Sequence, residues 1–249
     1  MNRIRQERIK EYIESKSVAT IKELQELIPN VSLMTIHRDL DALEKQGVIA
    51  KYRGGVKSIH HPDDVEFNVR MRENNKGKHI MAQKALSLLQ PHSSVFLDAS
   101  TSNLFVARSM PDISLNIVTT SPGVAVELCR LHNPVVTVCC GTMNRKNLAI
   151  SGQNTLEMLE KINIDTAFIG VSGCSAEVGF TCGTESDMLI KKLLIKKARC
   201  SVMMCSHEKL KRLMPYTFAM LDEVDYIISD ETLPEDFVSA AKEKGVIVL

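Results

Sequence analysis

The 249-residue chain contains 31 Lys and Arg residues against 30 Asp and Glu, 44% hydrophobic residues and seven cysteines. This composition is typical of a soluble globular protein, and no apolar run approaches the roughly 18 residues of a membrane span. The charged amino terminus, MNRIRQERIKEYIESK, is unlike a signal peptide, and irregularly spaced cysteines are typical of reduced thiols. We therefore expect a cytoplasmic protein without a metal ion, a cofactor or a membrane partner.

The first sixty residues predict three helices followed by a β-hairpin. Apolar residues at helical spacing outline a first helix over residues 4–13, and TIKE at residues 20–23 is a capping box that opens a second. The third helix lies in VSLMTIHRDLDALEKQG, residues 31–47, where Ser32 is an N-cap and Gly47 a stop. The run VIAKYRGGVKSI follows, and its paired glycines predict the turn of a hairpin.

This order of elements predicts a winged helix-turn-helix domain over residues 1–57, whose third helix would enter the major groove of double-stranded DNA. A small positive excess in residues 1–60, 11 Lys and Arg against 8 Asp and Glu, agrees with such a partner. On the third helix, Ile36, Leu40 and Leu43 share one apolar face. The DNA-binding candidates are Met34, His37 and Arg38 for base edges, and Ser32, Thr35, Lys51 and Arg53 for phosphates.

A different pattern begins near residue 76 and continues to residue 249. Residues 58–75 are polar without a regular period, and we interpret them as a linker. Beyond them, short apolar runs such as SVFLDA, LNIVTT and DTAFIGV alternate with helical segments. Such alternation predicts an α/β domain with a mostly parallel, Rossmann-like sheet covered on both faces. Ligands of these sheets bind beyond the carboxyl ends of the strands, so polar residues at those ends are candidates for a binding site.

The clearest candidates for ligand contacts follow two predicted strands. In DASTSN, residues 98–103, three successive hydroxyl residues would stand at the start of a helix, where the helix dipole and free amides favour a phosphate. An ordinary helix cap needs only one such hydroxyl. Charged residues later in the chain are further candidates, although a solvated helix face explains most of them. The complete set is Asp98, Ser100, Thr101, Ser102, Thr119, Thr120, Ser121, Glu185, Lys191 and Lys209.

The chain resembles the DeoR family of bacterial transcriptional regulators over essentially its full length. The similar segments are VSLMTIHRDLDALEKQG and AKYRGG in the first domain, and VFLDAST, IVTTS, CCGTMNRK, DTAFIGVSG, GFT, EK and IISD in the second. The resemblance implies a DNA-binding repressor whose second domain senses a phosphorylated sugar or a related metabolite. It also implies that this domain shares its fold with ribose-5-phosphate isomerase. Gly141, retained from the family's glycine pair, joins the effector-binding candidates.

The sequence departs from the family pattern at several positions. His37 stands where the family usually has the first of two arginines, and Arg53 stands where its wing usually has histidine. Both changes keep a polar donor, so the resemblance still implies DNA binding, with a different preferred sequence. In the second domain, Ala99 and Cys140 replace usual glycines, and Ser206 replaces the usual acidic residue. These replacements leave the identity of the ligand open.

We therefore predict a transcriptional regulator, a repressor of a sugar-utilisation operon that a phosphorylated sugar controls, and not an enzyme. Two alternatives remain. A sugar-phosphate isomerase with an appended DNA-binding domain would need a carboxylate base, but IGVSGCSAE has no Asp and only a distant Glu177. A DNA-bending or activating factor would need no ligand. Because one recognition helix reads few base pairs, we also expect a homo-oligomer, a dimer or a tetramer.

Overall fold

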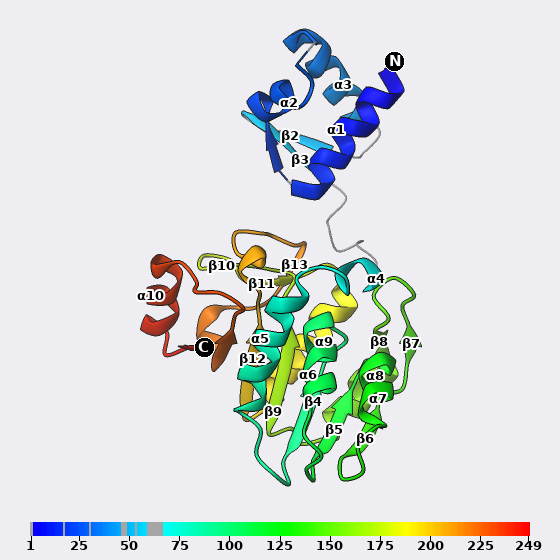
Figure 1. Ribbon diagram of the computed structural model, residues 1–249, viewed down its shortest axis with the longest axis vertical. Coiled ribbons are helices and arrows are strands. Elements are labelled where there is room, and N and C mark those ends of the chain that lie inside the picture. Colours follow the sequence, from blue (N-terminus) through cyan, green and yellow to red (C-terminus); the bar gives the residue numbers. More distant parts are fainter. Residues whose placement is uncertain (1, 17, 30, 46–48, 53, 59–66) are drawn as a thin grey trace. The chain divides into compact units, whose positions relative to one another are not determined.

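The computed structural model describes residues 2–16, 18–29, 31–45, 49–52, 54–58 and 67–249 (Figure 1). The contacts divide the chain into two compact units, Met1–Asp64 and Val65–Leu249. The first unit has one hydrophobic core, and the second has a core on each side of its main sheet. Among the helices of the described residues, none combines the length and the apolar content that crossing a bilayer requires.

The first unit is a winged helix-turn-helix. Its elements are α1 (Asn2–Lys16), β1 (Val18–Thr20), α2 (Ile21–Leu27), α3 (Leu33–Lys45), β2 (Ile49–Tyr52) and β3 (Gly55–Ser58). The predicted capping box opens α2, because Glu23 N donates to Thr20 Oγ1 at 3.2 Å and Thr20 N donates to Glu23 Oε2 at 2.8 Å. The predicted hairpin pairs Tyr52 with Gly55, and β1 joins it in the strand order β1-β3-β2.

The predicted apolar face of α3 is confirmed. Ile36 and Leu40 are completely buried and Leu43 is nearly so, because a helix that packs on its neighbours turns one face inward. These side chains meet Ile9 of α1 and Leu24 of α2 in the core of the unit. The opposite face of α3 is thereby held toward solvent.

The second unit is built around a seven-stranded parallel sheet. In sheet order its strands are β15 (Ile247–Val248), β14 (Tyr226–Ile228), β12 (Cys200–Met204), β9 (Thr166–Gly170), β4 (Ser94–Leu97), β5 (Asn116–Thr119) and β6 (Val135–Val138). Its helices are α4 (Phe67–Arg70), α5 (Asn75–Leu86), α6 (Thr101–Ser109), α7 (Pro122–Leu128), α8 (Gln153–Glu160), α9 (Glu185–Lys197) and α10 (Glu235–Glu243). Smaller antiparallel pieces are β7 (Thr142–Met143) with β8 (Ile150–Ser151), and β10 (Gly173–Ser175) with β11 (Gly179–Cys182) and β13 (Tyr216–Ala219). Two single turns, η2 (His207–Lys209) and η3 (Leu221–Glu223), complete it.

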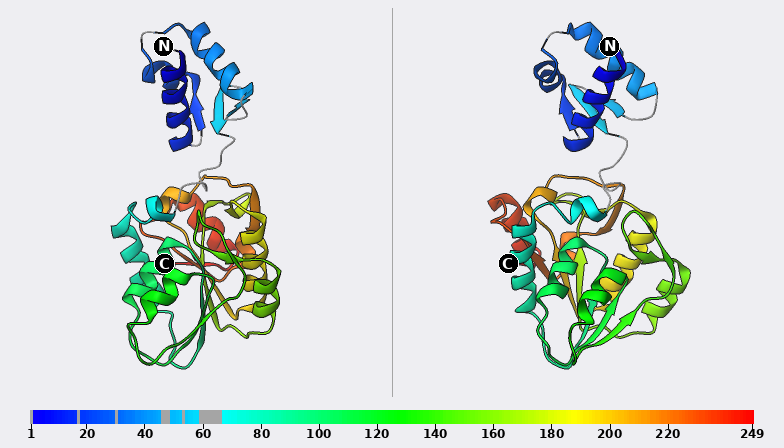
Figure 2. Two further views of the ribbon diagram at one scale, coloured as in Figure 1. Left: turned by 90° about the vertical axis from the view of Figure 1, so that its right-hand side faces the viewer. Right: turned by 45° about the vertical axis from the view of Figure 1, so that its right-hand side comes forward.

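Helices cover both faces of the main sheet, as the alternation of elements predicts (Figure 2). Successive side chains of a strand point to opposite faces, so Phe96 of β4 packs on one side while Val95 and Leu97 pack on the other. Helices α5, α6 and α7 share the core of Val95 and Leu97, and helices α8, α9 and α10 share the core of Phe96. The parallel strands are thus buried on both faces.

The order of the strands reverses between β4 and β9. From β4 the chain proceeds through β5 to β6 at one edge, and it then returns to β9 on the other side of β4 and continues outward to β15. The connections that leave β4 and β9 consequently diverge. In open parallel sheets, ligands bind in the crevice that forms at such a reversal, beyond the carboxyl ends of the strands. These ends are Leu97 of β4 and Gly170 of β9.

Part of the predicted linker is structured. Residues 67–70 form α4, Phe67 is 7% exposed in the core of the second unit, and its amide donates to the carbonyl of Lys146 at 2.9 Å. Val65, Phe67, Val69 and Met71 alternate with polar residues here, a signal of an ordered segment that the interpretation of residues 58–75 as a polar linker overlooks. Residues 59–66 lie outside the described residues, and the domain limits at residues 57 and 76 remain predictions.

Candidate nucleic-acid interface and effector site

The solvent face of α3 carries the residues predicted to contact base edges. Met34 is 69% exposed, and His37 and Arg38 are exposed with it on the side away from Ile36 and Leu40. A guanidinium fork matches the two acceptors of guanine in the major groove, and an imidazole offers both a donor and an acceptor. The arrangement is the one that a recognition helix requires.

A buried carboxylate holds this face in place. Asp39 is 2% exposed, and it accepts hydrogen bonds from Arg5 Nε at 2.5 Å and from Gln6 Nε2 at 2.9 Å. The hydrogen bond to Asp39 raises the pKa of the Arg5 guanidinium. Because both donors belong to α1, Asp39 ties the middle of α3 to the neighbouring helix and does not face DNA.

Two of the predicted phosphate contacts cap α3. Ser32 Oγ accepts the amide of Thr35 at 3.3 Å, and the two hydroxyl oxygens are 2.9 Å apart. This is the geometry of an N-cap, which satisfies an amide of the first turn. Ser32 is exposed and Thr35 half-buried, so each keeps part of its surface in solvent.

The ammonium of Lys51, which the sequence predicts to contact a phosphate, lies beside two carboxylates. Its ammonium pairs with Asp41 on α3, and it lies 3.9 Å from Glu44 Oε2, while its amide donates to Glu44 Oε1 at 2.9 Å. The hydrogen bond from Lys51 lowers the pKa of Asp41. Lys51 therefore joins the wing to the recognition helix. Arg53, the remaining candidate, lies outside the described residues.

In the second unit, Asp98 organises the crevice between β4 and β9. It is 5% exposed, its Oδ2 accepts the amide of Gly170 at 2.7 Å, and its Oδ1 accepts the amide of Ser100 at 2.9 Å. Asn103 Nδ2 donates to the same Oδ1 at 2.8 Å and to the carbonyl of Phe168 at 2.7 Å. Both carboxylate oxygens are thus occupied, so Asp98 orders the loop from within the protein.

The hydroxyl loop stands at the start of α6, as the sequence predicts. Ser100 is the N-cap, with its Oγ accepting the amide of Asn103 at 3.2 Å. Thr101 is 6% exposed and Ser102 is half-buried. The groups that an anion can use here are the hydroxyls of Thr101 and Ser102 and the amides of the same two residues, which Ser100 does not cap.

The second hydroxyl loop is bound more tightly into the fold. Thr119 Oγ1 donates to the carbonyl of Leu97 at 2.7 Å and accepts the amide of Ser121 at 3.0 Å. Ser121 in turn caps α7 through the amide of Val124. Thr119, Thr120 and Ser121 are each at most 3% exposed. This loop therefore supports the end of β4 from the neighbouring strand.

Lys191 lies beneath the crevice and is 4% exposed. Its ammonium donates to the carbonyl of Gly170 at 2.8 Å, and it lies 2.8 Å from Asp187 Oδ2 and 3.9 Å from Asp98 Oδ2. Burial lowers the pKa of Lys191, but Asp187 and Asp98 raise it by more, so this pKa lies above its ordinary value. Lys191 therefore offsets the charges of the buried Asp98 and the half-buried Asp187.

The other candidates are spread around the same end of the sheet. Gly141 has a φ of +148°, and a Cβ there would collide with Thr155 and the carbonyl of Ser151, which is a structural reason for glycine. Glu185 is exposed in the first turn of α9. Lys209 closes η2, where its ammonium lies 3.9 Å from Glu208 Oε1.

Several residues of this region were not predicted. Asn103 is completely buried, and its Oδ1 has no hydrogen-bond partner within the described part of the chain. Lys78 of α5 is 7% exposed, donates to the carbonyls of Arg70 and Glu73, and lies 5.8 Å from the centre of the Phe105 ring. Asn103 closes the DASTSN segment, so its polar side chain three residues after an N-cap was a usable signal; for Lys78 the sequence has none.

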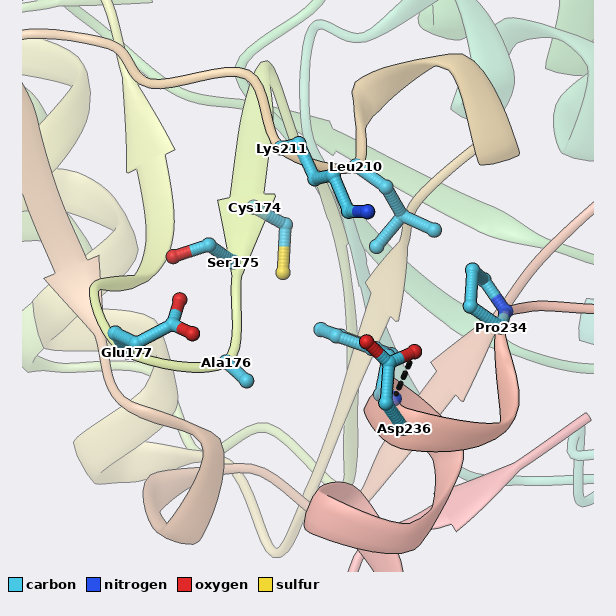
Figure 3. A pocket seen from close by; sticks show the side chains of 9 residues that line it. Cys174, Ser175, Ala176, Glu177, Leu210, Lys211, Pro234 and Asp236 are labelled. Atoms are coloured by element: carbon cyan, nitrogen blue, oxygen red, sulfur yellow. Dashed lines mark hydrogen bonds between the residues drawn. The ribbon is translucent and has the colours of Figure 1, made fainter.

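A cavity of about 200 Å³ lies between β10, the residues that follow η2 and the start of α10 (Figure 3). Its walls are Cys174, Ser175, Ala176, Glu177, Leu210, Lys211, Pro234, Asp236 and Phe237. The carboxylates of Glu177 and Asp236 lie on two sides of it, and the thiol of Cys174 points between them. The predicted effector residues do not line this cavity. The hydrogen bond with the Cys205 thiol, together with burial, raises the pKa of Cys174, which disfavours its thiolate form.

Comparison with known proteins gives matches to both units. The sequence profile of the DeoR-like helix-turn-helix domain matches residues 5–61, and that of the DeoR C terminal sensor domain matches residues 73–231. The HTH-type transcriptional regulator GlpR of Haloferax volcanii is 31% identical over 98% of this chain and 96% of its own. The L-fucose operon activator of Escherichia coli K12 is 28% identical over 93% of this chain and 96% of its own.

A solved structure is also similar. Ribose 5-phosphate isomerase A from Methanocaldococcus jannaschii superimposes over 53% of each chain, with 14% sequence identity and a TM-score of 0.39. This likeness is too low to support an inference about activity.

Proposed function

Since the chain belongs to the DeoR family of transcriptional regulators, we propose that it represses a sugar-utilisation operon and that a phosphorylated sugar controls its binding to operator DNA. The chain is a DNA-binding regulator and not an enzyme, because its relatives over the full length are regulators. These relatives argue against the alternative of an isomerase with an appended DNA-binding domain.

The observation that carries the effector proposal is the internally ordered loop at the start of α6. Asp98 holds the loop against Gly170, so the amides of Thr101 and Ser102 are already oriented before a ligand arrives. A phosphate there meets the positive end of the helix dipole. Lys191 reduces the repulsion between Asp98 and an incoming dianion, because it already pairs with that carboxylate.

The sugar part of the effector would extend from this loop across the ends of the neighbouring strands. Lys209 and Glu208 follow β12 in η2, and they have opposite effects on the pKa of Lys78 in α5, which Glu208 raises and Lys209 lowers. Burial lowers the pKa of Lys78, and Glu208 partly offsets this effect. These charged groups are suited to the hydroxyls of a sugar, which donate and accept hydrogen bonds.

We propose further that the protein acts in the cytoplasm as a dimer or a tetramer, with residues 1–57 reading DNA and residues 76–249 sensing the effector. Two copies of α3 would read two half-sites, which is the usual geometry of dimeric helix-turn-helix proteins. Repression is the expected direction of control, but the L-fucose operon activator among its relatives makes activation the alternative that a reporter assay must distinguish.

A thermal-stability screen of phosphorylated sugars tests the proposal. A ligand present at 100 times its Kd adds about 2.7 kcal/mol to the free energy of unfolding if it binds only the folded state. Each stabilising compound should also change operator binding, whereas its unphosphorylated sugar should do neither. Stabilisation by unphosphorylated sugars alone would contradict a phosphate site, and turnover of a sugar phosphate would restore the enzyme alternative.

A further inference from the structure

Asp230 connects two segments that lie far apart in the sequence. It follows β14, and its side chain is only 2% exposed. Its Oδ2 accepts Asn74 Nδ2 at 2.7 Å and lies 3.1 Å from His207 Nδ1, while its Oδ1 accepts the amide of His207 at 2.7 Å. Burial raises the pKa of Asp230, but the hydrogen bonds from Asn74 and His207 lower it by more, to about 2. The carboxylate is therefore ionised at neutral pH.

On one side, Asp230 meets the beginning of α5. Asn74 has a left-handed φ of +45° and caps this helix, with its Oδ1 accepting the amide of Gly77 at 3.1 Å. A Cβ on Gly77 would collide with the side chains of Asn74 and Asp230, so the helix start is packed directly on the carboxylate. Helix α5 is the first long helix after the segment that leads from the DNA-binding unit.

On the other side, Asp230 holds the first residue of η2. His207 is followed by Glu208 and Lys209, the charged residues that we assign to the effector. Both of these act on Lys78, whose ammonium lies over the Phe105 ring of α6, the helix that begins with the hydroxyl loop. Helix α5 therefore meets α6 through Lys78 and Phe105, and its N-cap Asn74 meets the turn η2 through Asp230, which is bonded to both.

We propose that Asp230 is a positioning residue that transmits effector binding from η2 to the start of α5. The inference rests on the proposed effector site and adds its route toward the DNA-binding unit. An effector that draws Lys209 toward the hydroxyl loop changes the place of His207. The Asp230 carboxylate accepts hydrogen bonds from both His207 and Asn74, and such charge-assisted hydrogen bonds resist stretching. A displacement of His207 therefore also displaces Asn74.

Hydrogen exchange of the full-length protein, with inorganic phosphate as the probe and chloride at equal ionic strength as the reference, tests this route. In the wild type, phosphate should slow exchange in residues 98–109, at the proposed site. It should also slow exchange in residues 204–210 and 74–86, about fivefold for a coupling at the low end of the usual range. Protection of residues 98–109 without residues 74–86 would overturn the coupling while leaving the effector site intact.

The variant Asp230→Asn should keep phosphate protection of residues 98–109 and lose it in residues 74–86. Asp225→Asn is the matched control, since Asp225 accepts Ser201 N at 2.7 Å at the opposite end of β14, and it should behave as the wild type. If Asp230→Asn still transmits protection to residues 74–86, the proposal is wrong. If phosphate protects nothing at residues 98–109 in the wild type, the effector site and the route both fail.

A swap of the two partners separates positioning from general stability. In Asn74→Asp with Asp230→Asn, a carboxylate still caps α5 and accepts the side-chain amide of position 230, whose oxygen can still accept the amide of His207, because the two side chains have the same shape. This double variant should regain protection of residues 74–86 that Asp230→Asn alone lacks. A double variant that folds, binds phosphate at residues 98–109 and still fails to transmit would contradict the proposed role.

Discussion

The carboxylate of Asp98 accepts the amide of Gly170 at 2.7 Å and so joins the ends of β4 and β9, the two strands between which the sheet order reverses. Lys191 approaches the same place from α9 and donates to the carbonyl of Gly170. One residue thus has both its amide and its carbonyl bound by buried charged side chains. We expect the stability of the crevice and its response to a ligand to depend on this junction.

Replacing Gly170 tests the junction directly. A Cβ at this position would collide with Ser100 and approach Asp98 Oδ2 at 3.2 Å, so Gly170→Ala should lower the free energy of unfolding by about 1–3 kcal/mol. Gly123→Ala is the matched control, because its Cβ would meet nothing closer than 3.7 Å in α7, and it should be neutral or stabilising. Urea denaturation of both variants measures the difference, and equal effects would argue against the close packing.

The exposed position of Arg38 on α3 predicts that its replacement lowers the specificity for operator DNA. Arg38→Ala should cost about 1–3 kcal/mol on operator DNA and much less on random DNA, because a base contact is lost. Lys45→Ala, an exposed lysine at the end of the same helix, should instead weaken both DNAs similarly. Titrations of both variants with operator and random duplexes measure these affinities. Discrimination that survives Arg38→Ala would show that another surface reads the sequence.

The ion pair between Lys51 and Asp41 predicts a gain of affinity. Asp41→Asn removes a negative charge beside the recognition face and leaves the Lys51 ammonium with only the more distant Glu44, so that it can turn to a phosphate. DNA of any sequence should then bind more tightly, and the salt slope should steepen by about one. The control Glu7→Gln removes an exposed carboxylate that pairs with Lys10 at 3.3 Å on α1, and should leave the slope unchanged. An unchanged slope for Asp41→Asn would mean that Lys51 stays away from DNA.

The pairing of His207 with Asp230 predicts a dependence on pH. Burial lowers the pKa of His207, but the hydrogen bond and charge of Asp230 raise it by more, above 6.5. The pair therefore stabilises the fold fully below the unfolded pKa, and this contribution is lost as pH rises through the raised folded value. The free energies of unfolding of the wild type and of His207→Gln should accordingly differ more at about pH 6 than at about pH 9. If this difference in the free energy of unfolding is the same at both pH values, His207 is not charged in the folded protein.

The sequence predicts the first unit well and the second unit unevenly. The stripe of Ile36 and Leu40 and the capping box at Thr20 are local patterns, so each can be recognised without the rest of the fold. Lys191 lies in a pair of lysines that is typical of a solvated helix face, yet it is buried, and tertiary structure brings Asp98 of another segment to within 3.9 Å of its ammonium. Asn74 and Asp230 are 156 residues apart, and no local period connects them.

The control of DNA binding by a phosphate at the start of α6 is tested most directly by operator titrations with and without a stabilising sugar phosphate. The wild type should change its operator affinity by roughly 5–150-fold, the usual range of allosteric coupling. Thr101→Ala should bind operator as the wild type does and respond far less, whereas Thr137→Ala on the edge strand β6 should respond fully. If Thr101→Ala responds as the wild type does, the phosphate binds elsewhere and the account of this site is contradicted.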